Sequence, residues 1–315
     1  MVVKKTKKIS IIILCILILL LSGCGTKKDK NENKISVVAS NFSLYDFSRA
    51  VCKDSCSVQM LVRPGAEMHG YEPSLSDIKK IRNADVFIYC GGESDVWIEN
   101  ILKSVDVKNK VIIKAMSVKG ITLYEEESTF FGDENEDEGE NHYDEHIWTS
   151  LKNASLITEK ICTSLSDIDS ENKSIYQKNA SEYIKKINKL QSGFEKLSRE
   201  KKNILAVADR FPLLYLAKDY DIEYIAAFSG CSSESDAGPK KIAKMSDEIK
   251  KQNIKTVFYI ELSNMKMADA VCEYTGTTKR LLHSCQQISL SDFESGKTYV
   301  EIMEENLSAL KEALL

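Results

Sequence analysis

Short apolar runs alternate with stretches of helical spacing along most of the chain. In the first half, the strand-like runs are residues 34–40, 56–62, 85–92 and 108–116, and a stretch with helical periodicity follows each of the first three. Alternation of strands and helices in this way predicts a parallel sheet covered by helical crossovers.

A second run of the same kind begins at Asn203. Its strand-like segments are residues 203–209, 222–230, 255–261 and 278–284. Helical stretches separate them, notably residues 239–252, and residues 298–315 close the chain with a further helical pattern. The pattern therefore predicts an α/β fold with two βα lobes, each built on a parallel sheet.

A long helix is expected between the two lobes, within residues 171–202. One apolar stripe recurs there at three- and four-residue steps, formed by Tyr176, Ala180, Tyr183, Ile184, Ile187 and Leu190. A rigid helix that joins the lobes would resist wide hinge closure, whereas the same stripe also fits a helix that packs on one lobe alone. We expect a first lobe at residues 35–166, a linking helix at 167–202 and a second lobe at 203–315.

Residues 1–24 form a separate segment with a basic start and an apolar run of secretory type. The run is shorter than the roughly 20 residues that a membrane-spanning helix needs. It ends in LSGC, which matches a bacterial lipobox in which Cys24 carries the acyl chains; the alternative is an uncleaved anchor. The polar residues 25–34 fit a tether. We expect a lipid-anchored protein on the extracytoplasmic face of the bacterial cell membrane.

Length and composition narrow the class of protein. The composition, with 43% hydrophobic and 29% charged residues, is that of an ordinary globular protein. The length of 315 residues favours two lobes over a single compact core. The net charge of -4 gives no reason to expect a nucleic acid partner. Nine cysteines are present, and Cys52 and Cys56 are close enough in sequence for a local disulfide, a weak metal pair or two free buried thiols.

An acidic segment, residues 125–145, interrupts the pattern. It contains eleven acidic residues and no Lys or Arg. Such a block repels itself, so we expect a solvated and unstructured loop. An alternative is weak collection of cations, assisted by His142.

The four histidines offer candidate metal chemistry. His69, His146 and His283 fall at the ends of predicted elements, and His142 lies in the acidic segment. Ligands of open α/β sheets bind outside the carboxyl ends of the strands, and imidazole is a common zinc ligand. Each histidine alone is more often structural, but their joint placement predicts a metal site.

Two motifs resemble the signatures of the metal-binding lipoproteins that supply zinc and manganese ABC importers. They are PGAEMHGYEPSLSDI, which contains His69, and DEHIWTS, which contains His146. The resemblance covers nearly all of the chain after the signal segment, including the closing GKTYVEIMEENLSAL. It implies a metal held in the cleft between two lobes, with His69 and His146 as two of the ligands and the other two from the second lobe.

The remaining ligands depart from the commoner family pattern. Arg210 falls nearest the expected third position, and its guanidinium cannot coordinate a cation, so Asp209 is the better candidate unless it only pairs with Arg210. For the fourth position we favour His283. The further candidates, as ligands or supporting groups, are Glu234, Glu261, Glu67 and Glu72; the last two could orient the ring of His69.

The resemblance implies the capture subunit of a metal importer, which binds Zn²⁺ and passes it to an ABC permease and its ATPase. Three imidazoles and one carboxylate suit zinc, whereas a site richer in oxygen ligands would favour the alternative cargo, Mn²⁺. We expect no enzymatic activity. A zinc hydrolase with Glu67 or Glu234 as general base and a surface adhesin are the alternatives from other classes.

Overall fold

The computed structural model describes residues 34–68, 70–126, 142–232 and 238–315. The predicted signal segment, the tether and the residues Cys24, His69 and Glu234 lie outside the described residues. By its contacts the chain divides into Met1–Lys34 and one compact unit, Ile35–Leu315. Within the described residues, no helix is both long and apolar enough to cross a membrane.

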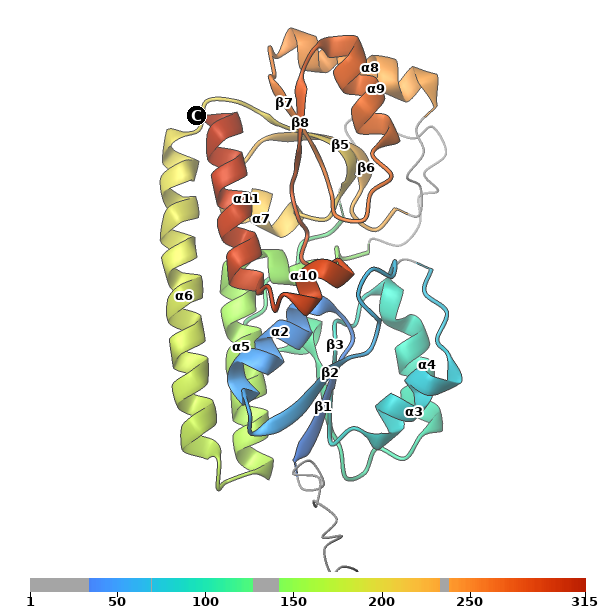
Figure 1. Cartoon of the computed structure of the whole chain (residues 1–315), viewed down its shortest axis with the longest axis vertical. Helices are drawn as coiled ribbons and strands as arrows, with labels where there is room; N and C mark the ends of the chain where they lie inside the picture. Colours follow the sequence, from blue (N-terminus) through green and yellow to red (C-terminus); the bar gives the residue numbers. More distant parts are fainter. Residues whose placement is uncertain (1–33, 69, 127–141, 233–237) are drawn as a thin grey trace, which may run out of the picture. The chain divides into compact units, whose positions relative to one another are not determined.

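The first lobe is a parallel sheet of four strands in the order β2-β1-β3-β4 (Figure 1). Its strands are β1 (Ile35–Ala39), β2 (Cys56–Met60), β3 (Val86–Tyr89) and β4 (Val111–Lys114). The helices between them are α2 (Phe42–Cys52), α3 (Leu75–Asn83) and α4 (Val96–Ser104). Helix α3 begins with a capping box formed by Ser74 and Asp77, which satisfies two backbone amides at its start.

The second lobe repeats the arrangement, with strand order β6-β5-β7-β8. Its strands are β5 (Leu205–Phe211), β6 (Tyr224–Ser229), β7 (Thr256–Tyr259) and β8 (Thr278–Leu281). The helices that accompany them are α7 (Leu214–Asp219), α8 (Pro239–Lys251), α9 (Lys266–Thr275) and α10 (Leu290–Glu294). All eight strands fall within or overlap the runs predicted from the apolar pattern.

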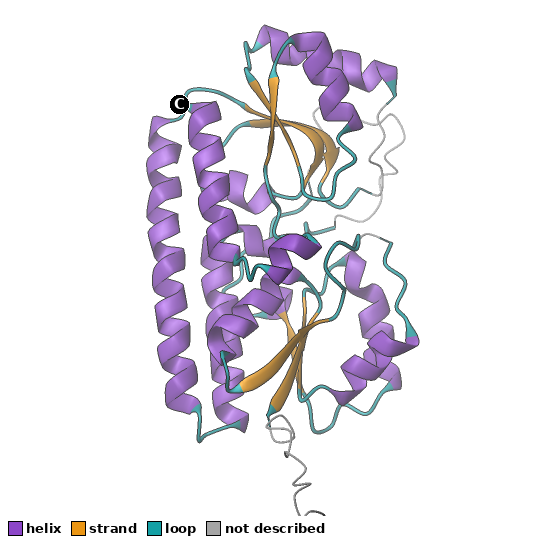
Figure 2. Ribbon diagram, in the orientation of Figure 1, coloured by secondary structure: helices purple, strands orange, loops and turns teal. Residues whose placement is uncertain are grey.

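Three long helices lie along one side of the sheets: α5 (Leu151–Ile168), α6 (Lys173–Glu200) and α11 (Tyr299–Leu314) (Figures 1 and 2). The predicted apolar stripe on α6 is buried except for the half-buried Ile184. Helix α6 contacts both lobes, since Asn179 Nδ2 donates to the carbonyl of Val51 (3.0 Å) and Ser198 Oγ donates to that of Tyr220 (2.6 Å).

The strands alternate between two faces, as parallel strands covered on both sides must. Val37 and Val207 point into one large core that also contains residues of α2, α5, α6 and α11. Val38 and Ala206 face the opposite way, into two smaller cores beneath α3 and α4 and beneath α8 and α9. One apolar core therefore runs through both lobes, and the α/β prediction of two parallel sheets with a long central helix is confirmed. The lobe boundaries at residues 166 and 203 stay predictions.

The cysteines outside the signal segment form no disulfide in the described structure. Five are buried and two, Cys231 and Cys272, are half-buried. Cys52 and Cys56 are among the buried thiols, and Cys56 Sγ lies 3.4 Å from the hydroxyl of Tyr176. Of the three sequence alternatives for this pair, the local disulfide is not seen in the described structure, and the other two stay open.

Candidate metal centre

Polar residues collect at the edge where the strands end. Ser40 follows β1 and Cys90 follows β3. Within the part of the chain that the structure describes, Ser40 Oγ, Asp95 Oδ1 and both amide atoms of Gln287 are buried without a hydrogen-bond partner. Buried polar atoms of this kind call for a ligand or water to satisfy them, and the carboxyl edge of a parallel sheet is the usual place for a ligand.

His146 is fully buried in the turn that leads into α5. Its backbone amide donates to Asp144 Oδ1 at 2.7 Å, and its ring Nδ1 lies 3.1 Å from the same oxygen. Asp144 is itself 1% exposed. A carboxylate on one ring nitrogen fixes the tautomer and direction of an imidazole, which is the usual support of a metal-binding histidine.

Neighbouring elements hold this turn in place. The hydroxyl of Tyr215 on α7 donates to the carbonyl of Asp144 (2.6 Å), and Cys90 Sγ donates to the carbonyl of Glu145 (2.9 Å). The indole of Trp148 packs edge-on against the His146 ring, with centroids 5.4 Å apart. Residues of both lobes therefore determine where the imidazole lies.

Buried acidic groups surround the imidazole. Burial, the largest single effect, acts to lower the pKa of His146, but the carboxylates of Asp144, Glu145 and Glu126 together outweigh it and the net pKa is raised. Burial raises the pKa of Glu145, and it raises the pKa of Asp95 to about 7. A divalent cation placed here would favour the ionised form of each carboxyl group, because a bound ion is the largest local charge in its site.

The described residues contain one group of three side chains with metal-ligand atoms close together: Asp144, His146 and Cys231, whose atoms all lie within 4.8 Å of one another. The predicted ligands His146, Asp209 and His283 do not form such a group in the described part of the chain. The predicted ligand set therefore remains a proposal.

Asp209 is buried and lies within β5, because this strand continues to Phe211. The sequence predicted that the strand ends at Asp209. The strand instead continues for two residues, after an irregularity in its pairing with β6 between Val207 and Arg210. One carboxylate oxygen accepts the amide of Arg210 (2.9 Å), and the other accepts the hydroxyl of Ser263. Burial raises the pKa of Asp209, although Ser263 and Arg210 act in the opposite direction.

His283 lies just beyond β8 and is 6% exposed. The amide of Cys285 donates to its Nδ1 at 2.9 Å, so Nδ1 carries a lone pair and the neutral ring bears its proton on Nε2. Glu261 Oε2 is 3.6 Å from the same nitrogen, which is too long for a hydrogen bond. In this arrangement the ring presents Nε2–H rather than a lone pair to a cation.

Glu261 stabilises the backbone next to His283. Its carboxylate accepts the amide of Ser284 (2.8 Å) and the hydroxyl of the same residue, and so holds the turn after His283. Asn306 holds the backbone of His283 from α11, accepting its amide (2.9 Å) and donating to its carbonyl (2.7 Å).

The guanidinium of Arg210 makes its direct ion pair with Glu67, and it acts on Asp209 only through its charge. Its Nη2 lies 3.0 Å from Glu67 Oε2, an ion pair that joins β5 of the second lobe to the segment after β2 of the first. Glu72 is exposed. The prediction that Glu67 and Glu72 orient the ring of His69 stays untested, because His69 lies outside the described residues.

The ends of the acidic segment approach each other, although residues 127–141 lie outside the description. Glu125 and Tyr143 form an isolated antiparallel bridge, and the amide of Glu126 donates to the carbonyl of His142 (2.8 Å). His142 is 48% exposed, and its Nδ1 lies 3.0 Å from Glu93 Oε1. His142 thus lies at the surface, in contrast to His146.

Sequence reasoning missed Asp144 and Cys231. Both are visible in the sequence: a carboxylate stands two residues before His146 in DEHIWTS, and a thiol directly follows the predicted strand at residues 222–230. Neither feature identifies a ligand until the fold brings the two segments together.

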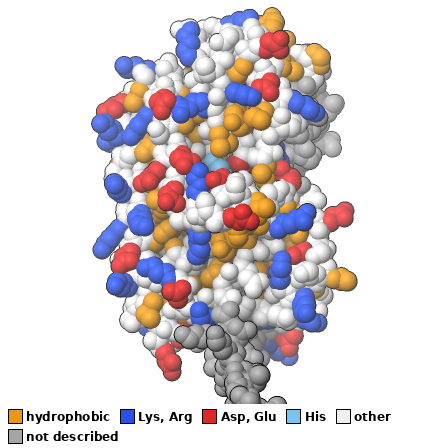
Figure 3. Space-filling view, viewed as in Figure 1, with side chains coloured by type: hydrophobic (Ala, Val, Ile, Leu, Met, Phe, Trp, Pro, Cys, Tyr) orange, Lys and Arg blue, Asp and Glu red, His pale blue; other side chains and the backbone are white. Residues whose placement is uncertain are grey.

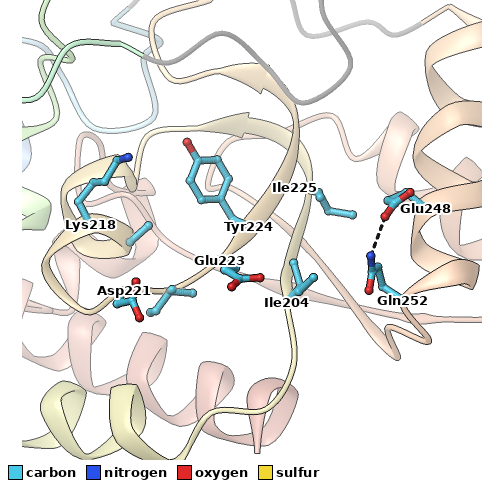
Figure 4. A pocket seen from close by; sticks show the side chains of 10 residues that line it. Ile204, Lys218, Asp221, Glu223, Tyr224, Ile225, Glu248 and Gln252 are labelled. Atoms are coloured by element: carbon cyan, nitrogen blue, oxygen red, sulfur yellow. Dashed lines mark hydrogen bonds between the residues drawn. The ribbon is translucent and has the colours of Figure 1, made fainter.

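The structure also contains a cavity of about 450 Å³ that is remote from this chemistry (Figure 4). Ile204, Glu223 and Tyr224 line it at the amino ends of β5 and β6, and Glu248 accepts a hydrogen bond from Gln252 (2.8 Å) on its α8 side. Parallel sheets bind ligands at the opposite, carboxyl ends.

Over the face drawn in Figure 3, positive and negative side chains are interspersed with hydrophobic ones.

The fold and the buried histidine–carboxylate pair define a class: two-lobed α/β substrate-binding proteins for metal ions. The family model described as "Zinc-uptake complex component A periplasmic" (ZnuA) matches residues 37–313. The chain belongs to this family.

Individual relatives agree with the family match. The high-affinity zinc uptake system protein ZnuA of Bacillus subtilis is 30% identical over 99% of this chain and 98% of its own length. The zinc-binding lipoprotein AdcA of Streptococcus pneumoniae is 28% identical over 97% of this chain, which spans only 61% of that relative. The Zn(II)-bound ZnuA-like domain of pneumococcal AdcA superimposes with a TM-score of 0.74 at 28% identity, covering 89% of this chain and 99% of that one.

Proposed function

We propose that this protein captures a divalent cation, zinc, outside the cytoplasm and delivers it to an ABC permease driven by its ATPase. The observation that carries the proposal is the fully buried imidazole of His146, oriented by Asp144 at the carboxyl edge of the sheets. The family membership and the relatives named as zinc-binding or zinc-uptake proteins support the same cargo.

The proposed ligands are His146 and His69 from the first lobe, with Asp209 and His283 from the second. His146 is the best supported of these because its ring is oriented and buried. The Asp209 carboxylate keeps lone pairs for a cation beside its hydrogen bonds to Ser263 and Arg210. His283 would have to give up the hydrogen bond from the amide of Cys285 before Nε2 could bind a cation. Glu261 and Glu234 are the alternatives at the second lobe.

Zinc is preferred to manganese on chemical grounds. Imidazole nitrogens suit Zn²⁺, and a site of this kind binds Zn²⁺ more tightly than Mn²⁺ in the general affinity order of divalent metals. Manganese remains the alternative cargo, and a larger share of carboxylate ligands would favour it.

The same proposal includes the lipid anchor. Residues 1–24 would direct export, Cys24 would carry the acyl chains, and residues 25–34 would tether the compact unit that begins at Ile35. Among the described residues, the base proposed for a zinc hydrolase, Glu67, forms an ion pair with Arg210 instead. The transport role is therefore preferred to a hydrolase.

The test is calorimetric titration of the full chain, purified in detergent and freed of metal, with zinc and then with manganese. We expect one tight zinc site. His146→Ala should weaken zinc binding by more than the roughly 10- to 100-fold that loss of a supporting group costs, whereas His142→Ala, at an exposed histidine of the same segment, should bind as the wild type does.

Two further outcomes decide the assignment. Zinc binding of unchanged affinity in His146→Ala would refute the proposed site, and His146→Gln repeats the test if the alanine variant does not fold. Asp209→Ala and His283→Ala examine the second-lobe ligands, and an affinity equal to that of the wild type in either variant removes that residue from the set.

A further inference from the structure

Cys231 lies beside the histidine–carboxylate pair but comes from the other lobe. It follows β6, while Asp144 and His146 precede α5. The metal-ligand atoms of the three side chains lie within 4.8 Å of one another. Zinc takes nitrogen, oxygen and sulfur ligands at about 2.0–2.3 Å, so a modest approach of the three side chains would place all of them on one ion.

Gly230 explains how the thiol is brought so close. A Cβ atom at this position would lie 2.7 Å from Asp144 Oδ2, 2.9 Å from the carbonyl oxygen of Phe211 and 3.3 Å from His146 Nδ1. Only a residue without a side chain allows the backbone to pass here. The backbone before Cys231 therefore packs directly on the pair, and the amide of Cys231 is fixed by Glu126 Oε1 at 2.8 Å.

A second, independent observation comes from Asp144. Its Oδ1 is hydrogen-bonded to the amide and the ring of His146, while Oδ2 is buried and has no hydrogen-bond partner among the described residues. A buried carboxylate oxygen left without a donor is costly. A cation at this point would satisfy it, and the nearby carboxyl groups of Glu145 and Glu126 add to the attraction.

We propose that Cys231, as a thiolate, coordinates the captured ion together with Nδ1 of His146, with Asp144 supplying a carboxylate oxygen. The ion takes the place of the hydrogen bond between this ring nitrogen and Asp144 Oδ1, because the carboxylate lies on the Nδ1 side of the ring. This inference rests on the proposed function and deepens it, because it names a ligand from the second lobe. The thiol releases its proton to solvent when the ion binds. A sulfur ligand favours thiophilic ions such as Zn²⁺ over Mn²⁺, which prefers oxygen, so Cys231 would determine specificity.

Cobalt(II) tests the assignment directly, because it fills zinc sites and a thiolate ligand gives it a charge-transfer absorption in the near ultraviolet. The full chain in detergent, loaded with Co²⁺, should show this band. In Cys231→Ser the band should disappear while the visible ligand-field bands remain. Cys272→Ser, at the other half-buried cysteine, should retain both.

The outcomes separate the two proposals. Failure of the wild type to bind Co²⁺ or Zn²⁺ would defeat the proposed function. Binding without the charge-transfer band, or a band that persists in Cys231→Ser, would overturn the thiolate assignment and leave the transport role intact. As a second readout, Cys231→Ser should lower the preference for Zn²⁺ over Mn²⁺ in direct competition by about 10- to 100-fold; an unchanged preference would also count against the assignment.

Discussion

The carboxyl groups of Asp144, Glu145 and Asp95, in the turn of His146 and near Glu145, differ in how completely their oxygens are hydrogen-bonded. Asp144 Oδ1 accepts from both the amide and the ring of His146, whereas Glu145 is bound by the amide of Ser94 at 3.0 Å. Asp95 accepts the amides of Cys90 and Gly91 through Oδ2 only. These buried acids lower the cost of placing a cation nearby, and burial raises the pKa of two of them, Glu145 and Asp95.

Asp95 provides a prediction on pH. Burial raises the pKa of its carboxyl group to about 7, from an ordinary value of 3.8. Folding therefore favours the neutral acid: its contribution to the free energy of unfolding is complete below about pH 4 and is lost as the pH rises through 7. Asp95→Asn should remove this loss, so the metal-free variant should gain on the wild type by about 1.4 kcal/mol per pH unit in that window.

Urea unfolding of both proteins with a chelator present, at several pH values between about 4 and 8, measures the difference. The exposed Asp54→Asn is the control for the change of charge. Parallel pH profiles for the wild type and Asp95→Asn would contradict the expectation.

At the level of single residues, the sequence proposed His146 as a ligand because its motif and its place after the acidic segment are local features, and this assignment stays a prediction. The sequence could not identify Asp144 and Cys231 as neighbours, because their proximity depends on how β6 of one lobe meets a turn of the other. The tautomer of His283 was equally hidden, since it is set by the amide of Cys285 in the folded chain.

Among the elements, the strands and the closing helix were the most predictable. Short apolar runs predicted the strands, and the helical pattern of residues 298–315 predicted α11, which Thr298 and Glu301 start with a capping box. The end of β5 was less predictable, because an irregularity in pairing continues the strand past Asp209. Such irregularities depend on the partner strand and leave no periodic signal.

Asp46 links three helices and provides a prediction at this scale. Its side chain, 1% exposed on α2, accepts the Tyr183 hydroxyl from α6 (2.6 Å) and the Tyr299 amide at the start of α11 (2.9 Å). It also pairs with Arg49. Asp46→Ala would leave these donors unsatisfied and should cost roughly 3–5 kcal/mol in the free energy of unfolding.

Tyr183→Phe is the matched variant, because it removes one hydrogen bond and leaves the carboxylate in place. It should cost about 0.5–1.5 kcal/mol, or up to about 3 kcal/mol if the charge strengthens the bond. Urea denaturation of the metal-free proteins compares the two. A smaller loss for Asp46→Ala than for Tyr183→Phe would show that Asp46 does not connect the helices.

For the molecule as a whole, the shared core limits how far one lobe can move relative to the other. A single hydrophobic cluster contains strand residues of both sheets together with α5, α6 and α11. Trp148 Nε1 donates to the carbonyl of Ser284 (2.8 Å), and Tyr299 donates its hydroxyl to the carbonyl of Trp148 (2.7 Å). Moving one lobe against the other would break packing as well as hydrogen bonds, unlike hinge closure about a flexible crossover.

We therefore expect zinc to change side chains and loops at the site while the lobes stay in place. Small-angle X-ray scattering of the full chain in matched detergent, with and without zinc, should give radii of gyration that agree within about 1 Å. Hydrogen exchange should slow at residues 142–148 and 229–232, and the amides of α6 should exchange alike in both states. His146→Ala with zinc is the control for non-specific effects. A contraction of several ångströms that is specific to the wild type would mean that the core shared by α5, α6 and α11 does not restrain the lobes.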